Sequence, residues 1–321
     1  MVSPTTSNLP YGPTIDTRFD WYQATGGAVP EGGRPWILVT PVEGFRGGGK
    51  DVVKIPGRNF YEFIKFFIDD RVLNGLATPF DIFVADGGYH LPSTEGPTLT
   101  ARKQLCLHAP ESFYQYQRCF QHIRTIIRDE PTRFPNLSAD RGGYAGFSSG
   151  GSAALVSAFT EPRSLHSRAY GGPYAHQYRR AESSRPAFMV NWSGGTDYRV
   201  GAQVQNNNIN IFAGVDADGW TRSYNEDILN AISAITLVSS KSPPTISIYD
   251  DFPGPGSVRP ISLPHDQLQA VELQAAFDAV GVYHEWHTKS IAGGFSDSLD
   301  PNIDIPKIYD FIVGPNALNL E

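Results

Sequence analysis

The residues best suited to chemistry lie in a short run rich in glycine and serine. Gly146, Ser148 and Gly150 form a G-x-S-x-G pattern, in which a strand turns so sharply into a helix that the central hydroxyl is raised above the sheet. The flanking residues must be small, because side chains there would strike the neighbouring strand and helix. The residues that follow, 151–154, are also small and would let the helix pack closely on the sheet. The pattern predicts that Ser148 is a nucleophile, although the same residues would suit a tight turn without chemistry.

The surrounding sequence alternates short apolar runs with amphipathic stretches. Apolar runs bounded by proline or glycine are typical of strands buried in a parallel sheet, and apolar positions spaced by three and four residues indicate helices. We expect strands over 34–41, 80–85, the residues before Ser148, 187–192, 245–249 and 282–286, and helices over 60–68, 113–131, the residues after Ser148, 228–238, 268–277 and 305–312.

This alternation predicts an α/β fold, with a mainly parallel central sheet and helices on both faces. Functional residues of such sheets gather at the carboxyl ends of the strands. Residues 1–33 are rich in proline, glycine and threonine, and we expect an N-terminal arm or edge hairpin there. Residues 34–321 are expected to form one domain, with a lid or insertion within 193–243.

Composition and charge narrow the class of protein. The chain has 321 residues, 40% of them hydrophobic, which is enough for one large core. A net charge of -7 without long charged runs argues against nucleic acid or an anionic membrane as partner. No membrane-spanning run or signal peptide is recognisable, so a cytoplasmic location is expected. Cys106 and Cys119 are expected to be reduced, and no pattern indicates an oligomeric state.

With the G-x-S-x-G run between an expected strand and an expected helix, the chain resembles the α/β-hydrolase superfamily. Within it, the resemblance is to carboxylesterases of the hormone-sensitive-lipase and feruloyl-esterase-like groups, and it spans roughly residues 34–315 by element order. It implies that Ser148 is the nucleophile of a serine esterase acting on a small molecule with an apolar moiety. It implies no cofactor.

The resemblance also implies hydrogen-bond donors for an oxyanion. One is the backbone N–H of Ser149, directly after the nucleophile. The family takes the others from a His-Gly-Gly-Gly-like loop after the first strand, where this chain reads Pro41-Val42-Glu43-Gly44 and has glycines only later, at 47–49. Any residue but proline carries a backbone N–H, so Glu43 and Gly44 are the expected donors. The glycines alone would also suit a mobile turn.

The acid of the triad is expected just after the strand over 245–249. Asp251 is the first choice, because the carboxylate must leave the strand end to reach a histidine, and Asp250 is the second. Asp197, after the strand over 187–192, is the third. An aspartate at a strand end followed by proline and glycine also suits a simple turn.

The general base departs from the family pattern. In the resembling esterases a histidine follows the last strand in a Gly-x-Gly-His-Gly-Phe-like loop, but this chain reads Ala292-Gly293-Gly294-Phe295 and has no histidine after His287. His287 could serve if its strand ends early, and would otherwise be a polar residue on an exposed strand face. His90 lies at the functional edge and is the next candidate. His265, near a helix start, suits a capping or surface role.

Two other groups resemble metal sites without meeting their requirements. His284, Glu285 and His287 lie on an expected strand, so they do not form a helical H-E-x-x-H zinc site. Asp216 and Asp218 resemble the start of a calcium loop but lack the remaining ligands, which favours a turn. We expect no metal.

Three functions of different classes therefore remain open. The first is an esterase that uses Ser148, an aspartate near residue 250 and a displaced histidine. The second is a degenerate hydrolase fold that catalyses a non-hydrolytic condensation, elimination or cyclisation. The third is a binding or scaffold protein that keeps the turn for structural reasons. A histidine within hydrogen-bond reach of Ser148 Oγ would separate the first from the others.

Overall fold

The computed structural model describes eleven stretches of the chain, namely residues 2–11, 18–41, 50, 52–56, 59–69, 78–86, 116–160, 182–199, 230–250, 267–289 and 299–320. The strands are β1 (Thr6–Pro10), β2 (Arg18–Tyr22), β3 (Arg34–Thr40), β4 (Asp81–Ala85), β5 (Leu137–Phe147), β6 (Phe188–Trp192), β7 (Thr245–Tyr249) and β8 (His284–Thr288). The helices are α1 (Asn59–Ile68), α3 (Ser149–Phe159), α8 (Leu268–Val280), α9 (Asp304–Val313), the short 3-10 helices η1 (Val52–Lys54) and η2 (Ala234–Leu237), and a helix over residues 116–129.

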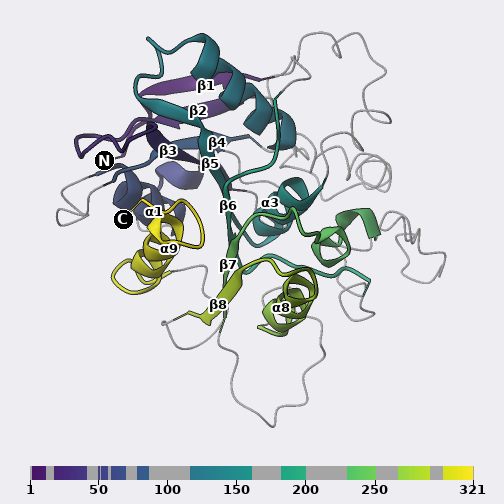
Figure 1. Ribbon diagram of the computed structural model, residues 1–321. Helices are drawn as coiled ribbons and strands as arrows, with labels where there is room; N and C mark the ends of the chain where they lie inside the picture. Colours follow the sequence, from purple (N-terminus) through teal and green to yellow (C-terminus); the bar gives the residue numbers. More distant parts are fainter. Residues whose placement is uncertain are drawn as a thin grey trace, which may run out of the picture.

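The strands form one sheet in the order β1-β2-β4-β3-β5-β6-β7-β8 (Figure 1). The six strands from β4 to β8 in this order pair in parallel, whereas β1 and β2 pair antiparallel at one edge. Because β5 lies in the middle of the sheet, its carboxyl end is flanked by the ends of β3 and β6. The expected mainly parallel sheet is confirmed.

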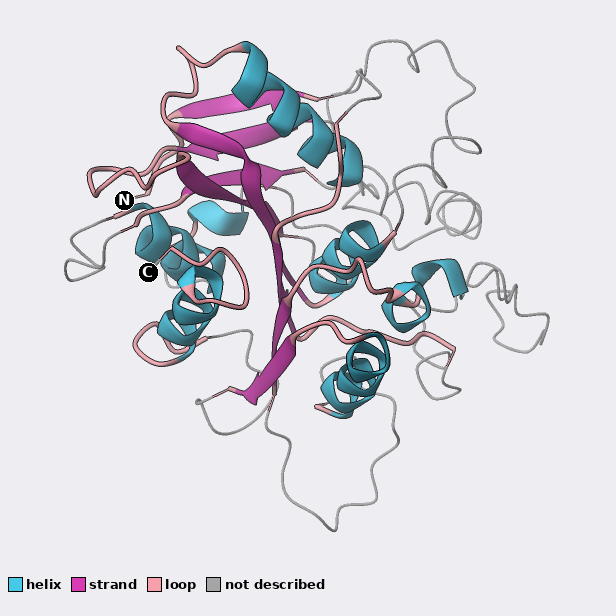
Figure 2. Cartoon of the chain, viewed as in Figure 1, coloured by secondary structure: helices cyan, strands magenta, loops and turns pink. Residues whose placement is uncertain are grey.

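Helices cover both faces of this sheet, as the edge-on strands of Figure 2 show. The apolar residues of α1 and α9 pack on one face, and those of α3, α8 and the helix over 116–129 pack on the other. Side chains alternate along β5 accordingly, so that Tyr144 joins the α3 side and Ala145 the α1 side.

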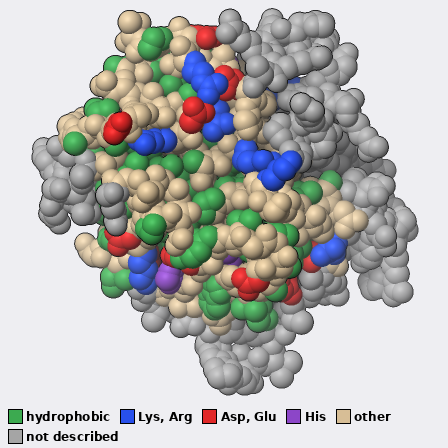
Figure 3. Space-filling view, viewed as in Figure 1, with side chains coloured by type: hydrophobic (Ala, Val, Ile, Leu, Met, Phe, Trp, Pro, Cys, Tyr) green, Lys and Arg blue, Asp and Glu red, His purple; other side chains and the backbone are tan. Residues whose placement is uncertain are grey.

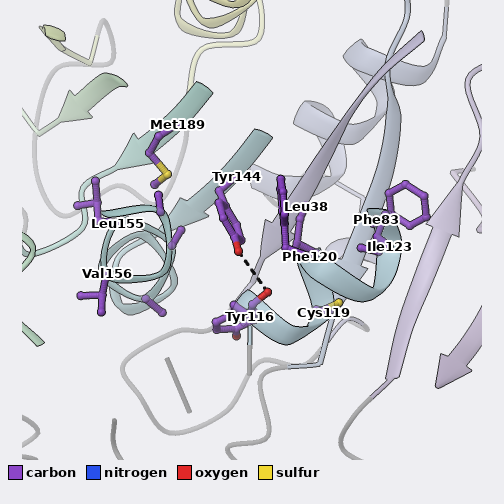
Figure 4. Close-up of a cluster of buried hydrophobic side chains, with 14 of the residues drawn as sticks. Leu38, Phe83, Tyr116, Cys119, Phe120, Ile123, Tyr144, Leu155, Val156 and Met189 are labelled. Carbon is purple, nitrogen blue, oxygen red and sulfur yellow. Dashed lines mark hydrogen bonds between the residues drawn. The ribbon is translucent and has the colours of Figure 1, made fainter. Parts of the chain in front are cut away.

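Aromatic packing on the α3 side anchors β5 (Figure 4). The rings of Tyr144 and Phe120 stack with centroids 4.6 Å apart, and Tyr144 donates its hydroxyl to the carbonyl of Tyr116 at 3.3 Å. A buried phenol needs such a partner, since an unpaired hydroxyl in the core is costly. The strand that leads into Ser148 is therefore held firmly on one side.

Of the arm and the edge hairpin expected for residues 1–33, the structure has strands at the edge of the sheet: β1 and β2 pair antiparallel and β2 pairs with β4, so the sheet extends before residue 34. Two other details differ from the expected elements. The helix expected over 228–238 is interrupted at Ser233, with helical residues at 230–232 before it and the 3-10 helix η2 after it, while residues 228 and 229 lie outside the described residues. Strand β8 begins later than expected and continues to Thr288, because it pairs with β7 along the whole length of that strand.

Residues 193–198, at the start of the expected lid or insertion, are buried in the described structure. They contact both α3 and α8 through hydrogen bonds, while residues 200–229 lie outside the described residues. Cys119 is a buried free thiol, and Cys106 also lies outside the described residues.

The described surface carries mixed charge. Figure 3 shows acidic and basic side chains interspersed on one face, with apolar side chains between them. None of the described helices combines the length and apolar character needed to cross a membrane.

Candidate active site

Ser148 lies at the carboxyl edge of the sheet, between the end of β5 and the start of α3. Its backbone has φ 52° and ψ -121°, with a positive φ that residues other than glycine rarely adopt. Its N–H donates to the carbonyl of Trp192 at 2.8 Å, and its carbonyl accepts the N–H of Ser152 at 3.0 Å. Such backbone strain costs on the order of 1–3 kcal/mol and is concentrated at functional sites.

The turn closes too tightly for a side chain at residue 146. A Cβ on Gly146 would lie 2.3 Å from Thr40 Oγ1 and 2.4 Å from the carbonyl oxygen of Gly150. These two atoms are themselves joined, since Thr40 Oγ1 donates to the Gly150 carbonyl at 2.8 Å. Thr40, at the end of β3, thus ties the neighbouring strand to the first turn of α3.

The first turn of α3 also packs directly on the chain after β6. A Cβ on Gly194 would lie 2.6 Å from Ser152 N, so only glycine allows this contact. Asn191 Oδ1 accepts the N–H of Gly194 at 3.0 Å, and Tyr249 donates its hydroxyl to the Gly194 carbonyl at 2.6 Å. Asn191 also donates to the Tyr249 hydroxyl at 2.8 Å. Strands β6 and β7 therefore hold residue 194 against the helix.

Asp250, one of the expected acids, directly follows β7 and is paired with a lysine. Lys289 Nζ donates to Asp250 Oδ1 at 2.6 Å, with the two side chains 1% and 4% exposed. The ammonium group also lies over the rings of Phe147 and Trp192, at 5.5 Å and 5.8 Å from their centroids. Asp250 is thus bonded to an ammonium group, and Asp251 lies outside the described residues.

Asp197, the third expected acid, is paired with Arg199. Its carboxylate accepts hydrogen bonds from Arg199 Nε at 2.9 Å and from the terminal nitrogen Nη2 at 2.7 Å. Burial acts to raise the pKa of Asp197, but the bonds and charge of Arg199 outweigh it, and the pKa lies below its ordinary value. This aspartate is therefore ionised and held by an arginine.

The structure does not bring His287 to the nucleophile. Because β8 continues to Thr288, His287 lies inside the strand, where its Nε2 is 3.1 Å from Glu285 Oε1. Its side chain is 37% exposed and lines a groove of about 320 Å³ between β8 and α9. Two strands, β6 and β7, separate β8 from β5, a backbone distance of about 14 Å at ordinary strand spacing. The condition for His287 to act as base, an early end of its strand, is not met.

The other described histidines are also engaged elsewhere. His284 Nε2 lies 3.0 Å from Ser247 Oγ, and its ring stacks on Phe277. Burial lowers the pKa of His284 to about 4, so the ring is neutral near pH 7. His122 packs its ring against Phe19. The remaining candidate bases, His90 and His265, lie outside the described residues.

The expected oxyanion donors are only partly within the described chain. Ser149 is the first residue of α3, where backbone N–H groups point out of the helix and carry its positive dipole end. Glu43 and Gly44 lie outside the described residues. The described part of the chain contains no cluster of three or more histidine, cysteine, aspartate or glutamate side chains arranged to hold a metal ion, and Asp216 and Asp218 lie outside it.

Lys289 and Thr40 belong to this edge, although no sequence motif marks them. Each stands at the carboxyl end of a parallel strand, one residue after β8 and at the last residue of β3. For Thr40, a polar residue at the end of an apolar parallel strand is a sequence signal, whereas the strand before Lys289 is itself polar and gives no such signal.

No protein-family model matches the sequence, and no curated protein matches it. Solved structures do match in fold. An acetyl ester-xyloside bifunctional hydrolase from Caldicellulosiruptor lactoaceticus is 15% identical over 97% of both chains, with a TM-score of 0.56. A propionate-bound thermophilic esterase from Thermogutta terrifontis is 11% identical over 97% of this chain and 94% of its own, with a TM-score of 0.62. A carboxylesterase from Lactobacillus plantarum is 16% identical over 98% and 96%, with a TM-score of 0.56. The chain has the α/β-hydrolase fold of these esterases.

Proposed function

We propose that this protein is a serine esterase that hydrolyses a small-molecule ester through Ser148. The observation that carries the proposal is the backbone of Ser148, a strained serine at φ 52° on the carboxyl edge of a central parallel strand. The serine also stands at the junction of β5 and α3, where the first backbone N–H groups of the helix can stabilise a negative charge on a reacting oxygen.

In the proposed reaction, Ser148 Oγ attacks the carbonyl carbon of the ester while its proton passes to a base. The carbonyl oxygen becomes an oxyanion, which the N–H of Ser149 at the positive end of α3 stabilises together with a donor from the loop of Glu43 and Gly44. The base then protonates the leaving alcohol. Water attacks the acyl-enzyme by the reverse steps and releases the acid.

For the base we propose His90, with Asp251 as the acid that orients it. His287 lies inside β8 with its Nε2 on Glu285, and Asp250 accepts a hydrogen bond from Lys289, so we assign the two roles to other candidates. His90 follows Asp86, at the carboxyl end of β4, by four positions in the sequence. A base from the segment after β4 would replace the histidine that the resemblance places after the last strand, while the serine and the acid keep their expected places.

For the substrate we propose a small-molecule ester with a short acyl group and an apolar moiety. The similar solved structures include an acetyl ester-xyloside hydrolase and an esterase with bound propionate, both of which concern acyl groups of two or three carbons. Acetyl and propionyl esters of nitrophenol are therefore the first substrates to test.

The test is labelling by a fluorophosphonate probe, which reacts covalently with activated serines, together with cleavage of these aryl esters. The wild type should be labelled, and Ser148→Ala should lose both labelling and turnover. Ser193→Ala is a matched control, because Ser193 is another buried serine with φ 53° at the carboxyl end of a strand, β6. Its hydroxyl contacts the Ile248 carbonyl at 3.3 Å, and its loss should leave labelling unchanged.

One observation favours a second candidate, a degenerate hydrolase fold with a non-hydrolytic or binding role. The acid position after β7 is neutralised by Lys289, and the three described histidines, His122, His284 and His287, are all engaged elsewhere. A wild-type protein that neither reacts with the probe nor cleaves any ester would favour this candidate.

A further inference from the structure

The peptide between Ser148 and Ser149 has a defined orientation. Its carbonyl accepts two hydrogen bonds from one residue, the N–H of Ser152 at 3.0 Å and the hydroxyl of Ser152 at 3.3 Å. In a trans peptide the N–H points opposite to the C=O in the same plane, and the described chain contains no cis peptide. The two hydrogen bonds from Ser152 hold the Ser148 carbonyl toward α3. They therefore also direct the Ser149 N–H away from the helix.

The hydroxyl of Ser152 is held in turn by a tyrosine from another element. Tyr198, after β6, donates its hydroxyl to Ser152 Oγ at 2.5 Å, and both side chains are buried. Because this bond occupies an acceptor position of Ser152 Oγ, it restricts the directions in which Ser152 can donate, and the Ser148 carbonyl lies in reach. The three groups form a chain from Tyr198 through Ser152 to the elbow peptide.

Tyr198 is itself fixed by its surroundings. Its backbone N–H donates to Ser233 Oγ at 2.9 Å, and the neighbouring Thr196 donates its N–H to Gln269 Oε1 of α8 at 2.8 Å. Burial raises the pKa of the Tyr198 phenol above its ordinary value, so the hydroxyl stays protonated and remains a donor. Tyr198 thus links the residues between β6 and α8 to the first turn of α3.

We infer that Ser152 and Tyr198 are positioning residues that aim the Ser149 N–H at the oxyanion of the reaction. The inference rests on the proposed function, since it assigns a role in stabilising the same transition state. Both side chains are buried, so they act on the reaction through the peptide rather than by direct contact. Both act through the tilt of one peptide plane.

The effect should appear in the chemical step rather than in substrate binding. Removing a whole oxyanion donor costs about 10²–10³ in kcat, and a misaimed donor retains part of its strength. We expect Ser152→Ala to lower kcat about 10-fold and Tyr198→Phe about 3-fold to 10-fold, with KM changed less than twofold. The second-order rate of fluorophosphonate labelling should fall by the same factors, because the probe also places an oxygen in the oxyanion site.

The double variant gives the sharpest test. Because Tyr198 acts only through Ser152, Tyr198→Phe should have no further effect on kcat once Ser152 is alanine. Independent effects that multiply in the double variant would overturn the inference, and so would a rise in KM at constant kcat.

A matched control separates positioning from general loss of a buried hydroxyl. Tyr309→Phe removes a buried phenol of α9 that donates to the Thr78 carbonyl at 3.3 Å, on the opposite face of the sheet from α3. It should lower the melting temperature about as much as Tyr198→Phe while leaving kcat unchanged. If Ser152→Ala does not fold, the comparison of Tyr198→Phe with Tyr309→Phe is sufficient to test the inference.

The outcomes distinguish this inference from the proposed function. A wild type that is labelled at Ser148, with Tyr198→Phe labelled at the wild-type rate, refutes the positioning role and leaves the esterase proposal standing. A wild type that is not labelled at all refutes both.

Discussion

Lys289 and Asp250 join the carboxyl ends of β8 and β7 through a 2.6 Å hydrogen bond between Nζ and Oδ1. Parallel pairing brings these ends together, as the bond from the Lys289 N–H to the Tyr249 carbonyl at 2.8 Å also shows. The resemblance to esterases places the expected acid and base of a triad after these two strands. In this chain the residues directly after β7 and β8, Asp250 and Lys289, form a buried ion pair. The proposed acid and base are therefore other residues.

Replacing Asp250 with asparagine should destabilise the protein severely. The change would remove the carboxylate that Lys289 Nζ contacts at 2.6 Å, and removing one partner of a buried ion pair typically costs about 3–5 kcal/mol in the free energy of unfolding. Urea denaturation of Asp250→Asn measures this loss. Asp140→Asn is the control, because Asp140 is paired with Arg128 on the surface, with a side chain 77% exposed, and an exposed pair contributes about 0–1 kcal/mol. Equal midpoints for the two variants would show that the Lys289–Asp250 pair contributes little.

Replacing Gly146 with alanine should disrupt the elbow. The new Cβ would meet Thr40 Oγ1 at 2.3 Å and the Gly150 carbonyl at 2.4 Å, so β3 or α3 must move. We expect a loss of about 1–3 kcal/mol in stability and loss of fluorophosphonate labelling. Gly281→Ala is matched as a glycine variant, since Gly281 ends α8 at φ 69° with nothing within 4 Å of a new Cβ. It should cost stability through backbone strain but keep labelling. An active Gly146→Ala protein would show that the elbow can relax without loss of function.

His90→Ala should lower kcat/KM by about 10³-fold or more, because a serine without its base loses most of its reactivity. His287→Ala is the paired control. His287 contacts Glu285 on a half-exposed strand face, so its loss should change kcat/KM less than twofold and stability by about 0.5 kcal/mol or less. Steady-state kinetics on nitrophenyl acetate measure both. The opposite pattern, with His287→Ala inactive and His90→Ala active, would return the role of base to His287.

The stability of the protein should fall as the pH drops from about 6.5 to about 4, owing to His284, whose pKa burial lowers from 6.5 to about 4. Above pH 6.5 the ring is neutral in both folded and unfolded chains, and its contribution to stability is full. Between these values the unfolded chain binds a proton that the folded chain does not, which costs on the order of 3 kcal/mol by pH 4. Below pH 4 both states are protonated, and this loss levels off.

Urea denaturation at several pH values measures the slope. His284→Phe, beside the stacked ring of Phe277, should reduce the pH dependence in this window, whereas His287→Ala should keep it. An unchanged slope in His284→Phe would assign the acid sensitivity to other groups.

Much of the architecture follows from local sequence patterns. Apolar runs such as Phe188–Trp192 and Thr245–Tyr249 are too short for helices and are bounded by breakers, so their composition alone indicates buried strands. The position of Ser148 between a strand and a helix also follows from local sequence, because small residues at 146 and 150–154 fit a sharp turn into a closely packed helix. These features depend on neighbours along the chain.

The sequence could not indicate the partners that lie across the sheet. The Lys289–Asp250 pair, the contact of Tyr198 with Ser152 and the bond from Thr40 to Gly150 join residues 39, 46 and 110 positions apart. Each depends on strand order and register, which are set by the packing of the whole core rather than by any local pattern.

The sequence by itself determined the type of fold and the strained serine, since both follow from side-chain size and hydrophobic period in short segments. Only the tertiary structure decided that His287 lies inside a strand and that the N-terminal residues join the sheet. Strand β8 continues to Thr288 because β7 offers it pairing partners, and β2 joins the sheet because β4 would otherwise leave an edge of unpaired backbone groups. Backbone hydrogen bonding between distant segments, which no single segment encodes, places His287 inside a strand and away from Ser148.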